Sequence, residues 1–147
     1  MTFQITIADA SHVEQLFEME KICFPDECWS IGSVKSELSK ENSICLIALC
    51  EGDFAGYVFS SFVYDESELN RIAVLPKYRN KKIAISMLEY LIEYMTKNNC
   101  KTLFLEVREN NKAAIDLYKK AGFNTIGIRN NYYTNPTENA ILMSLEL

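Results

Sequence analysis

The sequence predicts a three-layer α/β domain whose central strands are parallel. An apolar segment at 69–74 is followed by a helical pattern, and the same order recurs at 102–107, which is typical of parallel strands joined by helices. A hairpin pattern at 44–63 and two closing strands predict that the sheet extends on both sides of this centre. A chain of 147 residues is long enough to bury one core, so residues 1–147 are predicted to form a single domain.

Composition and charge exclude several classes of function. Hydrophobic residues make up 48% of the chain and charged residues 24%, which is ordinary for a globular protein. The net charge of −5 argues against general nucleic-acid binding. No apolar run is long enough to span a bilayer, and the first residues do not resemble a secretory leader. We therefore expect a cytoplasmic protein that binds neither nucleic acid nor membranes. The sequence leaves the oligomeric state open, and a monomer is expected.

The cysteines predict neither a metal site nor a disulfide framework. They form no C-x-x-C pair, and the chain has a single histidine, so the ligand spacings of a zinc site are missing. An odd number of cysteines is typical of reduced thiols that pack as small hydrophobes. The five cysteines are Cys23, Cys28, Cys45, Cys50 and Cys100.

The N-terminal third predicts a strand and two helices. Alternation of apolar residues at 2–8 predicts a half-buried strand. Ser11 and Glu14 form a capping-box pattern that predicts the start of the first helix. A loop containing Trp29 follows, and Ser30 is predicted to cap the second helix.

Turn and cap signals place the remaining elements. Apolar residues at helical spacing predict a long helix from Ala84 to Met95. Asn111 is predicted to cap a further helix that ends at Gly122. A polar, aromatic loop is predicted at 130–139. The other strands are predicted at 44–50, 54–63, 102–107, 124–128 and 140–147.

A basic turn separates the central strand from the long helix. The strand stops at Pro76, which cannot donate to a sheet ladder. A strand, a turn and a helix start together present free backbone N–H groups and the positive end of a helix dipole to an anion. Side-chain cations gather at the same place, at Lys77, Arg79, Lys81 and Lys82. This pattern predicts a phosphate-binding turn.

Two further side chains are candidates for acid–base chemistry. Glu106 lies near the carboxyl end of an apolar strand, and Tyr118 lies on the next helix. Ligands of open α/β sheets bind at the carboxyl ends of strands, so we expect Glu106 near the phosphate-binding turn. A carboxylate and a phenol in one cleft can act as base and acid. The residue types are also consistent with non-catalytic roles, in which Glu106 is a solvated charge at the end of the strand and Tyr118 is an aromatic residue of the core. Trp29 likewise fits either core packing or a substrate wall.

These motifs, in this order, resemble the GNAT superfamily of acyl-CoA N-acyltransferases, and the resemblance covers nearly the whole chain. The segments that carry it are Val74–Arg79 with Ile83-Ala84, Leu105–Arg108, Asn111–Ala114, Leu117-Tyr118 and Gly122-Phe123. Four further segments resemble the RimI type of this superfamily, whose members acetylate the N-terminal alanine of a small-subunit ribosomal protein. They are Phe24-Pro25, Trp29-Ser30, Asn131–Tyr133 and Ala140–Met143.

The resemblance implies a GNAT-like α/β/α domain with a mixed, centrally splayed sheet, acetyl-CoA as co-substrate and no metal. It implies Glu106 as general base, Tyr118 as general acid, and a channel for the N-terminal segment of a ribosomal protein. The implied channel walls are Trp29, Tyr132 and Tyr133. The implied acetyl-CoA contacts are Ile72, Ala73, Val74, Arg79, Asn80, Lys81, Lys82, Ile83, Ala84, Ile85 and Asn111.

The chain departs from the family pattern in the phosphate-binding turn. The family usually has glycine where this chain has Lys82, and often where it has Asn80, because glycine lets phosphate approach the backbone closely. Two alternatives therefore stay open beside the ribosomal acceptor. One is a GNAT enzyme that acetylates a small amine, and the other is an acyl-CoA-binding module with weakened catalysis.

Overall fold

The computed structural model describes residues 2–147. Across that range seven strands form one mixed sheet in the order β1-β2-β3-β4-β5-β7-β6. The strands are β1 (Phe3–Ile7), β2 (Ser43–Cys50), β3 (Asp53–Val63), β4 (Glu66–Val74), β5 (Thr102–Arg108), β6 (Asn124–Tyr133) and β7 (Glu138–Glu146). The helices are α1 (Val13–Cys23), α2 (Ile31–Ser39), α3 (Ile83–Lys97) and α4 (Lys112–Lys120), with 3₁₀ turns at Ala10–His12 and Pro76–Tyr78.

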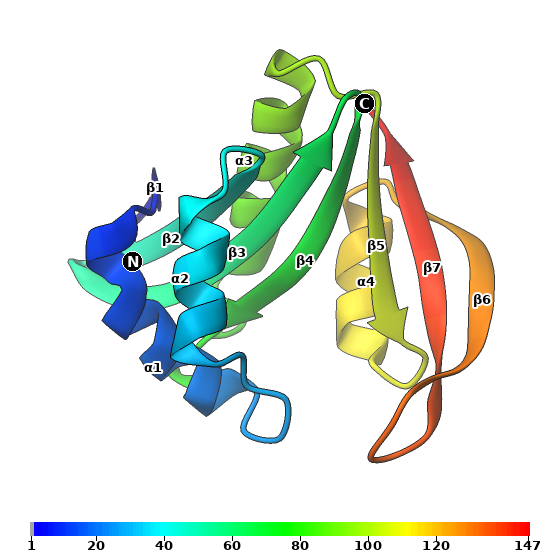
Figure 1. The fold of residues 1–147 in the computed structure, drawn as a ribbon, viewed down its shortest axis with the longest axis horizontal. Coiled ribbons are helices and arrows are strands. Elements are labelled where there is room, and N and C mark those ends of the chain that lie inside the picture. The colour runs from blue at the N-terminus through cyan, green and yellow to red at the C-terminus, as the bar shows by residue number, and fades with distance from the viewer. Residues whose placement is uncertain (1) are drawn as a thin grey trace.

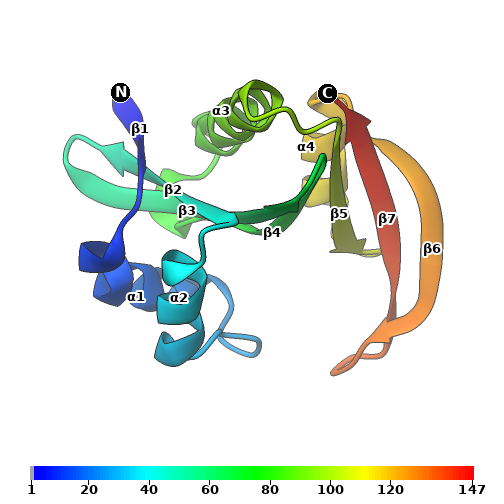
Figure 2. The same ribbon diagram turned by 45° about the horizontal axis from the view of Figure 1, so that its top comes forward.

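The helices cover the sheet in two layers (Figures 1 and 2). α1 and α2 lie on one face, whereas α3 and α4 lie on the other. Each layer buries its own apolar cluster. Leu16 and Val34 pack with β2 and β3 on the first face, and Leu88 and Leu91 of α3 pack against the sheet on the second. The predicted three-layer arrangement is therefore confirmed. No helix within residues 2–147 is both long and apolar enough to cross a membrane.

The two central strands are parallel but paired over a short length. β4 and β5 are in register only from Glu66 opposite Thr102 to Glu68 opposite Phe104. β4 stays paired with β3 as far as Val74, and β5 stays paired with β7 along its whole length. The strands therefore diverge toward their carboxyl ends (Figure 1), and the facing edge of each lacks a ladder partner there.

A β-bulge in β4 marks the point of divergence. Ser60 of β3 lies opposite Leu69 and Phe59 lies opposite Arg71, so Asn70 is an additional residue in β4. Because side chains alternate along a strand, one additional residue places two successive side chains on the same face. Asn70 donates to the Ser61 hydroxyl (3.0 Å) and Arg71 reaches α1, both on the α1 and α2 face.

The local signals were correct at most helix ends. Ser30 accepts a hydrogen bond from the Ser33 N–H (3.1 Å), and Asn111 accepts one from the Ala114 N–H (3.2 Å), so both predicted caps are confirmed. Gly122 has a φ of +104°, as expected for the residue that follows a helix.

Two local predictions were wrong. The cap before α1 is Asp9, whose carboxylate accepts from the Ser11 N–H (2.9 Å), so Ser11 lies inside the 3₁₀ turn. The segment 130–139 is mostly strand, because β6 continues to Tyr133 and β7 begins at Glu138. Pairing with β7 therefore carries these polar residues into the sheet.

Candidate active site

The diverging strands open into a cleft of about 1620 Å³ that reaches both faces of the sheet. Of the residues predicted from sequence to form the site and its basic turn, all but Lys77 and Lys81 line this cleft. They are Trp29, Ile72, Ala73, Val74, Arg79, Asn80, Lys82, Ile83, Ala84, Ile85, Glu106, Asn111, Tyr118, Tyr132 and Tyr133. One cavity therefore brings together residues that lie more than 100 positions apart in the chain.

The turn between β4 and α3 requires a glycine-like backbone at two positions. Asn80 and Lys82 have φ values of 63° and 65°, in the left-handed region that glycine adopts most easily. The departure from the family pattern thus falls where the backbone disfavours a side chain. Asparagine tolerates this region, whereas lysine is strained in it. Arg79 holds the turn against the strand, because its Nε–H donates to the Val74 carbonyl at 2.9 Å.

The start of α3 carries unbalanced positive charge. The N–H groups of 83–85 precede the first intrahelical hydrogen bond, which the Ser86 N–H donates to the Lys82 carbonyl at 3.2 Å. The first turn of α3 holds no acidic residue. Lys82 and Arg79 add cations at this positive end of the helix dipole, an arrangement that an anionic ligand stabilises. These properties favour phosphate binding, and the assignment of the phosphate to this turn stays a prediction.

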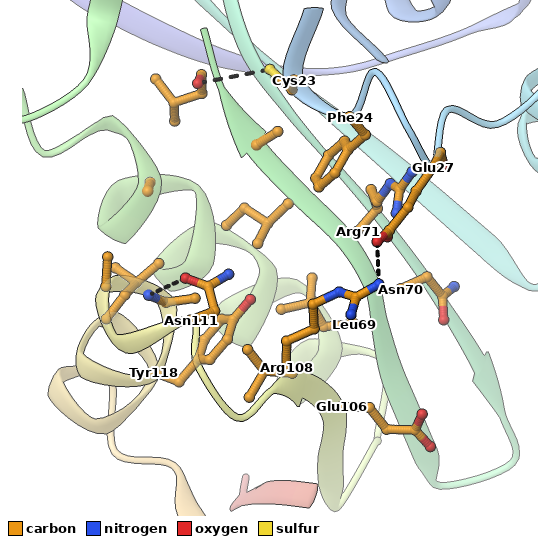
Figure 3. A pocket seen from close by; sticks show the side chains of 18 of the residues that line it. Cys23, Phe24, Glu27, Leu69, Asn70, Arg71, Glu106, Arg108, Asn111 and Tyr118 are labelled. Atoms are coloured by element: carbon orange, nitrogen blue, oxygen red, sulfur yellow. Dashed lines mark hydrogen bonds and ion pairs between the residues drawn. The ribbon is translucent and has the colours of Figure 1, made fainter. Parts of the chain in front are cut away.

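Tyr118 lines the α4 side of the cleft. Its ring packs against Phe123, with 5.8 Å between ring centroids, and only 6% of the residue is exposed. Burial, and to a smaller extent Tyr133, raises the pKa of the phenol above its ordinary value. Asn111, which caps α4, lies on the same side of the cleft (Figure 3). Tyr118 is therefore both a core aromatic and a protonated donor at the cleft wall.

Glu106 lies on the other face of β5. Its neighbours Leu105 and Val107 are buried on the α4 side, so alternation directs Glu106 toward the α1 and α2 face. Its carboxylate lies 3.5 Å from the Arg129 guanidinium and near the Tyr132 hydroxyl. This nearby carboxylate raises the pKa of Tyr132.

The position of Glu106 along the strand corrects one expectation. Since Glu68 lies opposite Phe104, Glu106 lies two residues into the divergence, at the narrow end of the cleft. The basic turn follows Val74, at the wide end. Glu106 is therefore in the same cleft as the turn but not beside it. Glu68 is its nearer neighbour in β4: burial, followed by repulsion from Glu106, raises the pKa of Glu68.

The three aromatic residues predicted as channel walls have different surroundings. Trp29 packs on Phe59, with ring centroids 5.0 Å apart, so it belongs to the core and to the cleft wall at once. Tyr132 and Tyr133 form an edge-to-face pair at 5.1 Å in strand β6 rather than in a loop. Burial, followed by the charge of Glu106, raises the pKa of Tyr133 to about 12.

A buried ion pair on the α1 side was missed by the sequence analysis. Glu20 is fully buried and accepts hydrogen bonds from Arg71 Nη2 (2.8 Å), Arg71 Nε (3.0 Å), the Trp29 N–H (2.9 Å) and the Tyr57 hydroxyl. Burial opposes the charge, yet the hydrogen bonds from Arg71, Trp29 and Tyr57 hold the pKa of Glu20 below its ordinary value. The signal in the sequence was the position of Glu20 on the apolar stripe of α1, which indicates a buried charge.

Comparisons with known proteins agree with this geometry. The family model described as "Acetyltransferase (GNAT) family" matches residues 13–123. The ribosomal protein bS18-alanine N-acetyltransferase of Haemophilus influenzae is 35% identical over 146 residues, which cover 97% of this chain and 98% of that protein. The protein of the same name from Escherichia coli K12 is 43% identical over 98 residues, covering 65% of this chain and 66% of the relative, just under two thirds of its length.

A comparison of folds points to the same family. The crystal structure of the ribosomal-protein-S18-alanine N-acetyltransferase from Escherichia coli superposes with a TM-score of 0.92 at 33% identity. The match covers 99% of this chain and 94% of that one. Fold and cleft together define an α/β transferase of acyl groups. The chain belongs to the acetyltransferase (GNAT) family, whose members take an acetyl group from acetyl-CoA.

The residues present fit acetyl-CoA. The unpaired edge of β4 offers backbone groups to the amides of the pantetheine arm, which are themselves donors and acceptors. The turn at 79–82 and the start of α3 offer N–H groups and cations to the pyrophosphate. Within residues 2–147, no group of three or more His, Cys, Asp or Glu side chains is placed to hold a metal ion.

Proposed function

We propose that this protein acetylates the N-terminal α-amine of an alanine that begins a small-subunit ribosomal protein. Support comes from the Haemophilus influenzae relative, which matches along almost its whole length and bears that activity in its name. We further propose that residues 1–147 act as one GNAT domain.

The observation that carries the proposal is the passage of one cleft through the sheet. The basic turn and α3 lie at one side, and Trp29, Glu106 and Tyr132 line the other. A donor and an acceptor can therefore approach the same point from opposite faces. Holding both reactants in one cleft supplies much of the rate enhancement of a two-substrate reaction.

Glu106 is proposed as the general base. The acceptor amine must be neutral to attack a thioester. An α-amine has an ordinary pKa of about 7.7–8.0, against about 10.4 for lysine, so a carboxylate can neutralise it more readily. Glu106 accepts the proton that the acceptor amine loses, through a water molecule. Arg129, at 3.5 Å, holds its carboxylate in place.

Tyr118 is proposed as the general acid. Bound acetyl-CoA supplies an activated thioester, whose carbon–sulfur bond breaks as the nitrogen–carbon bond forms. Tyr118 gives its phenolic proton to the departing sulfur, and the second proton of the acceptor nitrogen passes through water to restore the phenol. The raised pKa keeps the phenol protonated until the carbon–sulfur bond breaks. Backbone N–H groups near Ile72–Val74 stabilise the charge on the carbonyl oxygen. The cysteines take no part, because the transfer needs no covalent enzyme intermediate.

The test is an acetyl-CoA assay against short peptides that differ in their first residue, followed by the release of free thiol. We expect an alanine-starting peptide to be preferred over other peptides and over a panel of small amines. Preference for a small amine would overturn the ribosomal acceptor. Calorimetry with acetyl-CoA provides the second readout, since binding without turnover on any acceptor would identify a binding module instead.

A further inference from the structure

The loop between α1 and α2, residues 24–30, is held from both sides of the cleft at one residue. Arg71 of β4 donates from Nη2 to the Glu27 carbonyl at 2.6 Å. Arg108 of β5 donates from its own Nη2 to the Glu27 carboxylate, as the dashed line in Figure 3 marks. Glu27 therefore connects the two diverging strands across the cleft, on the face where Glu106 lies.

The attachment to β4 rests on an arginine that a buried ion pair holds in place. The guanidinium of Arg71 also binds the buried carboxylate of Glu20 and stacks on the ring of Phe24, 3.7 Å from its centroid. The side chain of Arg71 is 13% exposed and that of Glu20 is completely buried. Buried charges are screened little by salt, so the Arg71–Glu20 pair that holds this donor persists when ionic strength rises.

The attachment to β5 is a partly exposed ion pair that can open. The Glu27 side chain is 43% exposed, and within residues 2–147 its carboxylate has Arg108 as its one hydrogen-bond partner. Arg108 has other partners at the β6–β7 turn: the Glu138 carboxylate at 3.2 Å and the carbonyls of Thr134 and Pro136, both at 3.3 Å. When Glu27 moves away, Arg108 keeps these partners and stays in place.

We propose that the Glu27–Arg108 ion pair is a latch on the acceptor channel, with Glu27 as a positioning residue. Opening the latch admits the acceptor between the 24–30 loop and the β6–β7 turn, and closing it fixes the loop over the bound chain. The proposal rests on the proposed function, because it assigns this face to the acceptor. Loss of the ion pair then weakens acceptor binding and leaves acetyl-CoA binding unchanged.

The single tryptophan of the chain reports the state of the latch without any activity assay. Trp29 lies in the same loop, so acrylamide quenching of its fluorescence measures how tightly the loop is held. We expect quenching to increase in Glu27→Gln. Wild type should approach the variant as salt rises, because an exposed ion pair is screened, whereas Glu27→Gln should not respond to salt. Quenching that is equal in both proteins at all salt concentrations would overturn the latch.

The matched control is Glu18→Gln, which removes the same charge from α1. Glu18 pairs with Lys21 on the surface at 2.8 Å and does not line the cleft. This variant should leave the quenching of Trp29 as in wild type. An equal increase in Glu18→Gln and Glu27→Gln would assign the effect to net charge and overturn the latch.

Kinetics provide the second arm. Glu27→Gln should raise the KM for an alanine-starting peptide about two- to fivefold, the scale of a partly exposed ion pair, with the Kd of acetyl-CoA unchanged by calorimetry. In an Arg108→Gln background the same substitution should have no further effect. Additive effects, or a parallel change in acetyl-CoA affinity, would overturn the latch. If no peptide is acetylated at all, the proposed function fails, and the fluorescence result alone decides the latch.

Discussion

β4 and β5 border the same cleft, but their surroundings differ. β4 is covered on both faces, by α3 and by α1, and Arg71 ties it to the buried Glu20. β5 is covered by α4 on one face, and on the other it presents Glu106 and Arg108 to the cleft, each side chain more than one fifth exposed. The comparison indicates a difference in rigidity: β4 gives the cleft a fixed wall, whereas the β5 side carries the more exposed groups, to which the proposed proton transfer is assigned.

The largest expected effect tests the fixed wall. Arg71→Met leaves the Glu20 carboxylate buried without its cation, so the free energy of unfolding should fall by about 3–5 kcal/mol. Urea unfolding followed by circular dichroism measures the change. Glu18→Gln, on the same helix as Glu20, should stay within about 0.5 kcal/mol of wild type. A loss below about 1 kcal/mol in Arg71→Met would mean that the ion pair does not hold β4.

The next effect tests the chemistry assigned to the β5 side. Tyr118→Phe should lower turnover by about a hundredfold, the usual scale for removal of an acid catalyst, because no proton reaches the leaving sulfur. Thiol release measures turnover, and calorimetry should give an acetyl-CoA Kd close to that of wild type. Tyr64→Phe is the control, since Tyr64 is 94% exposed. Full activity in Tyr118→Phe would remove this phenol from the mechanism.

A pH series tests the buried carboxylate of Glu20, which holds the β4 wall. Glu20 has a lowered pKa in the folded protein, so the unfolded chain binds its proton more readily. Its contribution to stability is therefore complete above the ordinary glutamate value, about 4.3, and is lost as the pH falls through the lower folded value. Urea unfolding between about pH 3 and 6 should show a shallower acid dependence in Glu20→Gln. Equal slopes in the two proteins would contradict the prediction.

The smallest expected effect concerns the strained turn on the β4 side. Lys82→Gly should raise the free energy of unfolding by about 1 kcal/mol, because glycine adopts the left-handed backbone without strain. Thermal unfolding without ligand measures the gain. Lys81→Gly removes the same charge from a position that does not have a positive φ and should give no gain. Equal stabilisation by both substitutions would assign the effect to charge.

The sequence was sufficient for features that depend on neighbouring residues. The caps Ser30 and Asn111, the helix end at Gly122 and the basic turn each depend on a few adjacent positions. The cap before α1 was misplaced because Asp9 and Ser11 are both good capping residues and lie two positions apart. Local propensity does not decide which of the two is the cap. Asp9 is the cap because the 3₁₀ turn begins directly after it.

Features that depend on distant pairing were not predictable in the same way. Arg71 and Glu20 are 51 positions apart, and a charged residue within an apolar pattern indicates burial without naming its partner. Tyr132 and Tyr133 lie in a segment rich in asparagine, which favours a loop by composition, but hydrogen bonding to β7 extends the strand through it. The distance of Glu106 from the basic turn likewise follows from the β4–β5 register.

The bulge at Asn70 has a consequence for what the strand can tolerate. Upstream of it, Leu69 packs beneath α3, and downstream of it, Arg71 and Ala73 serve the opposite layer. Deleting Asn70 would place Arg71 directly after Leu69 and still opposite Phe59, as in a regular antiparallel pair. Arg71 and Ala73 would keep their face of the sheet, and the hydrogen bond from Asn70 to Ser61 would be lost. Deleting Ile72 instead would shift the side chains after it by one position and turn Val74 away from the cluster beneath α3. A single-codon deletion is thus expected to be far more damaging at Ile72 than at Asn70.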